Sequence, residues 1–253
     1  MAYRPEEATP DPANHVKGFP ESYFERLKIA LGLVKPRCHA LDLGTGRGEV
    51  ARGLVRHGAT VTAIDNDMAL LEVARGINIA ESARIDYLEA NAEATGLDDA
   101  SLDLVVAGKT WHVFDAKAVA AEAHRLLRMS GHLLIAEYAW QPLPRNVVEA
   151  TEELIAEIDA DWPDGGTNGL YGTWHPAVRA AGFIEHQTFL HDVDVEFTHA
   201  QWRAYVSRRA AERMTTSDIE RLDDRVVEML EKGFAGDYLV APHRAFTYIA
   251  QKN

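Results

Sequence analysis

Short apolar runs alternate with amphipathic segments through the first 140 residues. The apolar runs lie at 40–43, 61–65, 85–91, 102–107 and 132–138. The segments with helical periodicity lie at 49–57, 68–77 and 116–128. Apolar runs of this kind are typical of strands buried on both faces, and helices between them predict a parallel sheet. We therefore expect an α/β fold with a doubly wound, mostly parallel sheet whose ligands bind at the carboxyl ends of the strands.

The alternation of short apolar runs with amphipathic segments changes after residue 139. We expect helices at 146–159, 176–181, 199–213 and 218–232, and strands at 183–197 and 245–250. These strands bring the sheet to seven, and the sixth and seventh are separated by about 45 residues. The chain, 1–253, is expected to be one domain with a helical cap built from insertions after strands five and six. Its predicted parts are an N-terminal arm and helix (1–36), a cofactor-binding core (37–139) and two cap segments (140–173 and 198–240).

A glycine-rich turn follows the first apolar run. Asp42 interrupts that run, and Gly44, Gly46 and Gly48 follow before the helical period begins. Glycine lets a ligand approach the backbone closely, and the helix start offers unpaired N–H groups. Glu49 stands where a dinucleotide-binding motif requires its third glycine, which argues against NAD. The turn also lacks the Gly-Lys-Ser/Thr ending of a phosphate-binding loop.

The second apolar run ends in Asp65, 21 positions after Gly44. A carboxylate at the tip of the second strand can accept hydrogen bonds from both hydroxyls of a ribose. Together with the acidic glycine-rich turn, this strand-end acid forms a pattern that resembles the class I S-adenosylmethionine-dependent methyltransferases. The resemblance is to the small-molecule kind called methyltransferase type 11, and it implies a Rossmann-like methyltransferase fold. It is also carried by the segment 101–115 and by the helix, turn and strand at 123–135.

The resemblance implies S-adenosyl-L-methionine as the cofactor. The glycine turn would hold its amino group, Asp65 its ribose, and residues after the third strand its adenine. Met68 is expected either to pack on the adenine ring or to belong to the helix core. The full set of expected cofactor-binding residues is Asp42, Gly44, Thr45, Gly46, Asp65, Asn66, Met68, Asn91, Ala92, Glu93 and Gly108.

The end of the fourth strand is expected to face the transferred methyl group. His112 is the candidate general base, because an unperturbed histidine titrates near neutral pH. A structural histidine that holds the loop is the alternative. The expected substrate residues are Lys109, Trp111, His112, Trp140 and Tyr171. No metal site is predicted, because His186 and His191 differ by an odd number of positions and an unbroken strand sends them to opposite faces.

The net charge limits the binding partners that can be expected, and the cysteine content indicates the compartment. The chain carries 26 basic and 39 acidic residues, a net charge of −13, which disfavours nucleic acid and anionic membranes. Cys38 is the only cysteine, so an intramolecular disulfide is impossible and a reducing cytoplasm is expected. No apolar run is long enough to span a membrane, and no leader segment is recognised. A monomer or homodimer remains open.

These observations predict an enzyme that transfers a methyl group to an O, N or C nucleophile of a small molecule. Two alternatives remain. One is a non-catalytic protein that binds S-adenosylmethionine, and the other is an NAD-linked oxidoreductase. A methyltransferase acting on nucleic acid is disfavoured by the net charge.

Overall fold

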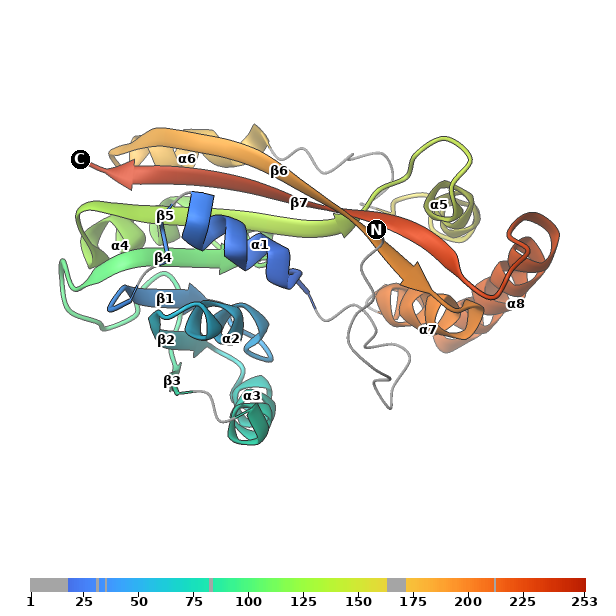
Figure 1. The fold of residues 1–253 in the computed structure, drawn as a ribbon, viewed down its shortest axis with the longest axis horizontal. Coiled ribbons are helices and arrows are strands. Elements are labelled where there is room, and N and C mark those ends of the chain that lie inside the picture. Colours follow the sequence, from blue (N-terminus) through green and yellow to red (C-terminus); the bar gives the residue numbers. More distant parts are fainter. Residues whose placement is uncertain (1–17, 31, 35, 82–83, 163–171, 212) are drawn as a thin grey trace. The chain divides into compact units, whose positions relative to one another are not determined.

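A computed structural model describes residues 18–30, 32–34, 36–81, 84–162, 172–211 and 213–253. Its described residues form one sheet of seven strands in the order β3-β2-β1-β4-β5-β7-β6 (Figure 1). The strands are β1 (His39–Leu43), β2 (Thr60–Asp65), β3 (Ile85–Glu89), β4 (Leu102–Gly108), β5 (Leu127–Trp140), β6 (Phe183–Phe197) and β7 (Leu239–Lys252). The arrow of β7 runs opposite to those of β5 and β6, so the sheet is mixed and mostly parallel, as expected (Figure 1).

Helices follow β1, β2 and β4, whereas β3 is joined to β4 without a helix, and the later helices lie in two longer connections after β5 and β6. They are α1 (Glu21–Glu25), α2 (Glu49–Arg56), α3 (Met68–Glu81), α4 (Ala116–Leu126), α5 (Val147–Ile158), α6 (His175–Ala180), α7 (His199–Ala210) and α8 (Thr216–Gly233). Single 3-10 turns occupy Trp111–Val113 and Gly172–Trp174. A π-helical turn, Arg26–Ala30, continues α1.

Register places the ends of the central strands side by side. β1 pairs in parallel with β2 and β4, and β4 pairs in parallel with β5. Leu43 lies opposite Ile64, and Gly108 lies opposite Ala136. The carboxyl ends of β1, β2, β4 and β5 therefore form one edge of the sheet, where this architecture binds ligands.

The chain divides into two compact units. One contains the sheet with α1 to α4 and α6, and comprises residues 18–138, the described part of 171–191, and 245–253. The other contains α5, α7 and α8 with the adjoining ends of β6 and β7, in the described parts of 139–170 and 192–244. The second unit covers much of the sequence that was expected to form a cap.

In the sheet unit, the core is built from strand and helix side chains that are almost fully buried. Leu41, Val105 and Leu133 of the sheet pack in one cluster with Val119 of α4 and Val178 of α6. In the same unit, α1 packs closely on α2. A Cβ atom on Gly53 of α2 would lie only 2.2 Å from the ring of Phe24 of α1. Burial of such apolar side chains contributes roughly 1.5–3 kcal/mol each, which makes the sheet a rigid support for its edge.

Several element boundaries differ from those expected. β5 begins at Leu127 instead of 132, because Ser130, at φ +65°, is accommodated within the strand instead of ending it. β7 begins at Leu239 instead of 245, and β3 ends at Glu89 instead of 91. The N-terminal helix stops being α-helical at Glu25.

Side chains satisfy the starts of the longer helices. Asn146 caps α5, and Thr198 with Gln201 forms a capping box at the start of α7. At the start of α8 the Thr215 side chain accepts a hydrogen bond from the Asp218 N–H. Residues 163–171 of the first expected cap segment lie outside the described residues.

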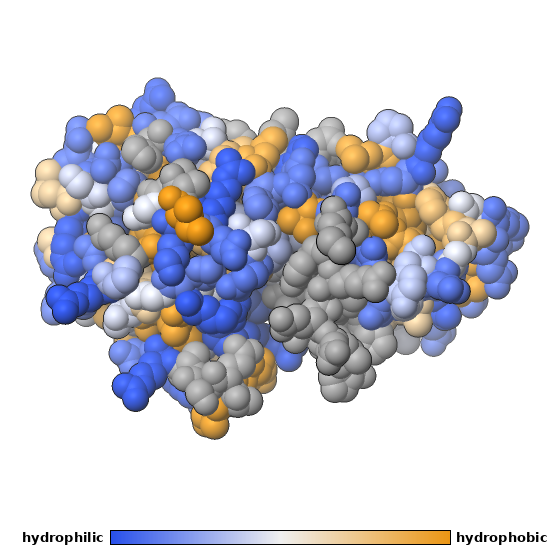
Figure 2. All heavy atoms as spheres, viewed as in Figure 1, coloured by the Kyte–Doolittle hydropathy of each residue, from blue (hydrophilic) through white to orange (hydrophobic). Residues whose placement is uncertain are grey.

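Hydrophilic residues predominate on the face drawn in Figure 2, where apolar residues occur in small separate groups. This agrees with a chain in which acids outnumber bases by 13. Among the described residues, no helix is both long and apolar enough to cross a membrane.

Candidate functional site

The glycine-rich turn joins β1 to α2 and has one closed and one open side. Gly44 and Gly46 adopt positive φ angles of 62° and 53°, a region that disfavours other residues. A Cβ atom on Gly44 would lie 3.0 Å from side-chain carbons of both Thr110 and Phe114. Among the described residues, none comes within 4 Å of a Cβ atom placed on Gly46. The turn is therefore packed against the loop after β4 at Gly44 and faces open space at Gly46.

Asp65 ends β2 and binds the same turn. Its Oδ2 accepts a hydrogen bond from the Gly46 N–H at 2.7 Å, and its Oδ1 accepts one from the Asp67 N–H at 2.9 Å. The residue is only 9% exposed. A carboxylate has about four lone-pair sites, so each oxygen retains one for a further donor. Asp65 can hold the glycine turn and still accept hydrogen bonds from a diol.

Asp42 lies beneath the turn with its carboxylate buried. Its Oδ2 accepts the Thr45 hydroxyl at 2.6 Å and the Ala51 N–H at 3.1 Å. Burial raises the pKa of Asp42 to about 7, partly offset by these two hydrogen bonds, and the neighbouring Asp65 carboxylate raises it further. The two acids are thus close enough to interact, as the sequence predicted. Thr45 points its hydroxyl inward to Asp42 instead of outward.

The residues expected around adenine lie at the ends of β2 and β3. Asn66 and Asn91 are exposed, and Ala92 is buried. Met68 is 41% exposed, so it does not belong to the helix core. Glu93 is half-buried, and its Oε1 accepts a hydrogen bond from the Asp115 N–H at 3.2 Å.

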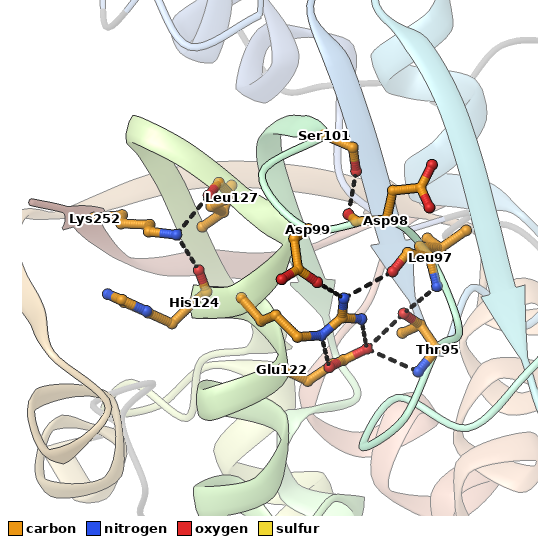
Figure 3. Close-up of polar contacts among 10 residues, drawn as sticks. Thr95, Leu97, Asp98, Asp99, Ser101, Glu122, His124, Leu127 and Lys252 are labelled. Atoms are coloured by element: carbon orange, nitrogen blue, oxygen red, sulfur yellow. Dashed lines mark hydrogen bonds and ion pairs between the residues drawn. The ribbon is translucent and has the colours of Figure 1, made fainter.

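The loop that carries these residues, 91–101, is fixed to α4 (Figure 3). Glu122 accepts both the N–H and the hydroxyl of Thr95, and Arg125 holds Glu122 and donates to the Leu97 carbonyl. The hydrogen bonds from Arg125 to Glu122 lower the pKa of that carboxyl to about 2. The loop is therefore held by charged groups before any ligand binds.

Both ends of α4 are also capped. Asp115 accepts the N–H groups of Lys117 and Ala118 at its start. Lys252 donates to the carbonyls of His124 and Leu127 at its end, at 2.7 and 2.8 Å (Figure 3). Such contacts satisfy helix-end groups that would otherwise lack partners.

The loop after β4 brings three expected residues to the same edge. Gly108 has no room for a side chain, because a Cβ atom there would lie 2.7 Å from Val50 and 3.3 Å from Phe19. Lys109 is exposed, with its Nζ 3.6 Å from Glu49 Oε2. Trp111 is 2% exposed and packs in the core, which gives it a packing role.

His112 lies beside an acid that the sequence analysis did not select. Its Nδ1 is 3.5 Å from Oε1 of Glu137, the residue after the buried run that ends at Ala136 of β5. The His112 side chain is 65% exposed, whereas that of Glu137 is 12% exposed. The sequence could have indicated Glu137, because this acid follows a buried apolar run, as Asp65 does. Phe19, which packs on this edge beside Gly108, had no such signal.

The last two expected substrate residues lie elsewhere. Trp140 belongs to the second unit, where it is 2% exposed and its indole N–H donates to Glu152 Oε1 at 2.5 Å. It packs there against Trp202, so it offers no open face. Tyr171 lies outside the described residues.

The expected cofactor fits the residues at this edge. The open space at Gly46, the spare lone pairs of Asp65 and the exposed side chain of Met68 lie where its amino acid, ribose and adenine parts would need them. No cluster of three or more potential metal ligands occurs among the described residues.

Comparison with known proteins agrees with this geometry. Residues 41–135 match the family model described as "Methyltransferase domain". An uncharacterized methyltransferase of Mycobacterium bovis is 37% identical over 93 residues, which is 37% of either chain. A ubiquinone/menaquinone biosynthesis C-methyltransferase of Zymomonas mobilis is 32% identical over 111 residues, 42% of this chain and 46% of that protein. The matches thus span less than half the length of these relatives.

Solved structures share the fold over almost the whole chain. A protein classed as a type II methyltransferase from Anaeromyxobacter dehalogenans superimposes with a TM-score of 0.66. It is 20% identical, and the match covers 93% of this chain and 97% of that one. The likeness therefore includes β6, β7 and the helices between them, beyond the matched domain.

Proposed function

We propose that the chain is a class I, S-adenosylmethionine-dependent methyltransferase that methylates an O, N or C nucleophile of a small molecule. The match of residues 41–135 to the model of a methyltransferase domain supports this proposal. The observation that carries the proposal is the meeting of two strand-end acids at an open glycine corner. Asp65 binds the backbone of Gly46, and Asp42 lies close enough to Asp65 for their charges to interact.

The edge of the sheet supplies a place for each part of the cofactor. Asp65 and Asn66 would hold the ribose, and Met68, Asn91, Ala92 and Glu93 the adenine. The turn Gly44–Gly46 would hold the amino acid end, with Asp42 supplying negative charge opposite the ammonium. When bound, the cofactor supplies an electrophilic methyl group on a sulfonium.

The acceptor is proposed to bind beyond the end of β4. The loop that carries Lys109 and His112 packs on the glycine turn, since Thr110 contacts Gly44 and donates its hydroxyl hydrogen to the Leu43 carbonyl at 3.0 Å. This places the loop beside the methionine end of the proposed cofactor site. Holding the nucleophile in line with the methyl group would supply most of the rate enhancement.

Two measurements test the function. Calorimetry with S-adenosylhomocysteine measures binding to the full chain, and a panel of hydroxyl, amine and carbon acids with methyl-labelled cofactor measures transfer. We expect tight binding and labelled product from at least one class. Binding without transfer across the panel would favour a protein that binds the cofactor without catalysis.

A thermal-shift comparison addresses the oxidoreductase alternative. S-adenosylhomocysteine should raise the melting temperature and NAD should not, because Glu49 occupies the position of the third dinucleotide glycine. A shift with NAD alone would contradict the proposal.

A further inference from the structure

Glu137 lies within β5, at the level where β4 ends. It follows Ala136, whose carbonyl accepts the Lys109 N–H at 2.8 Å, so the end of β4 is joined to β5 here. The His112 ring stands on the 3-10 turn just beyond, with Nδ1 3.5 Å from the Glu137 carboxylate. Both residues belong to the sheet unit.

His112 and Glu137 differ in exposure. A shielded acid suits a positioning role, and an exposed histidine suits a base that meets the acceptor. The Glu137 side chain is 12% exposed and is carried by a strand, whereas His112 is 65% exposed. A carboxylate with so little water gains from a nearby N–H donor. The separation of 3.5 Å exceeds that of an ordinary N–H···O hydrogen bond by only about 0.5 Å.

A matched pair elsewhere in the sheet unit lacks this asymmetry. His175 Nδ1 lies 3.7 Å from Glu185 Oε2, with side chains 33% and 41% exposed. An ion pair between two exposed side chains of this kind contributes little to stability. The pair of His112 and Glu137 therefore differs from the pair of His175 and Glu185 in its shielded carboxylate.

We propose that Glu137 is a positioning residue that holds the Nδ1–H tautomer of His112, so that Nε2 receives a proton from the acceptor during methylation. This inference rests on the proposed function and narrows the acceptor to one that gives up a proton as it is methylated, such as a hydroxyl, a protonated amine or an acidic carbon. The acceptor atom loses its proton to Nε2 and gains the methyl group, while the electron pair of the broken carbon–sulfur bond stays on sulfur. No oxidant or reductant is consumed.

Nitrogen NMR of the full chain tests the pairing without any acceptor. The ¹⁵N shifts of His112 report which ring nitrogen carries the proton in the neutral form. In the unsubstituted chain we expect Nδ1–H, and in Glu137→Leu we expect the population to move toward Nε2–H. Glu185→Leu is the matched control and should leave the His112 signals unchanged. An unchanged tautomer in Glu137→Leu overturns the inference.

Kinetics test the consequence. Glu137→Leu should lower kcat by about 100-fold, within the range of general-base effects, with KM and S-adenosylhomocysteine affinity unchanged. His112→Ala should lose a similar factor, and the double variant little more, because the residues act as a unit. Independent, multiplying losses would contradict the pairing, as would a normal kcat in Glu137→Leu.

A conservative variant guards against misfolding. Glu137→Gln keeps an acceptor for Nδ1–H but loses the charge, so it should retain the tautomer and lose about tenfold in kcat. A loss as large as that of Glu137→Leu with the tautomer retained would overturn the positioning role. Absence of transfer by the unsubstituted chain marks failure of the proposed function, whereas normal transfer by the Glu137 variants marks failure of this inference alone.

Discussion

The ends of β1 and β2 and the ends of β4 and β5 lie on one edge of the sheet but are built differently. At the first pair, Asp42 and Asp65 are 1% and 9% exposed, and backbone N–H groups occupy their carboxylates. At the second pair, the polar side chains of Lys109 and His112 are 41% and 65% exposed. A buried, hydrogen-bonded corner suits a ligand that is always the same, and an exposed loop suits an acceptor that differs between relatives.

The largest expected effect follows from removing the acid that holds the corner. Asp65→Ala breaks two hydrogen bonds to a carboxylate acceptor, each about 1.5–3 kcal/mol, and removes the proposed ribose partner. We expect S-adenosylhomocysteine affinity to fall at least about 100-fold in calorimetry. Asp86→Ala removes an exposed acid from β3 and is the charge-matched control. Equal affinity in both variants would remove Asp65 from the site.

The next effect concerns stability and pH at Asp42. Its raised pKa, about 7 against 3.8, means that the folded chain binds more protons than the unfolded chain between these values. Stability contributed by the neutral carboxyl is therefore fully present below pH 4 and is lost as the pH rises toward 7. At pH 8, ionisation of the buried Asp42 carboxyl destabilises the folded chain by on the order of 4 kcal/mol.

Asp42→Asn removes this cost because an amide stays neutral. The amide oxygen can replace Oδ2, which accepts both protein hydrogen bonds. Urea denaturation should show the variant to be more stable at pH 8, with the difference shrinking below pH 4. The same variant should bind the cofactor less well. A pH-independent difference in the free energy of unfolding would contradict the assignment.

A smaller effect separates the two sides of the glycine turn. Gly44→Ala meets Thr110 and Phe114 at 3.0 Å and takes up positive φ, so we expect a loss of roughly 2–3 kcal/mol. Gly46→Ala shares the positive φ but has open space, so the loss should be about 1 kcal/mol. Cofactor affinity should respond most to Gly46→Ala, relative to its loss of stability. Similar stability in both variants would show that the turn is not packed as described.

The sequence predicted the corner of β1 and β2 well because its contacts are local. Asp42 and Thr45 are three residues apart, and the strand, turn and helix that carry them follow one another. The pairing of His112 with Glu137 joins residues 25 positions apart through strand register, and no local pattern encodes that distance. Trp111 and Trp140 carry the same ambiguity: aromatic residues near strand ends fit either a pocket or a core, and burial places both in cores.

The smallest expected effect lies at the exposed end of β4. Lys109 and Glu49 form an ion pair at 3.6 Å, with side chains 41% and 35% exposed. Solvent screens such pairs, so Lys109→Ala should change the free energy of unfolding by less than about 1 kcal/mol, and less still at high salt. Alanine suffers the same strain at the positive φ of 62°, so the substitution isolates the side chain from the backbone. If methyl transfer falls while urea denaturation is unchanged, Lys109 acts on the acceptor; a matching loss of stability would instead make it part of the rigid corner.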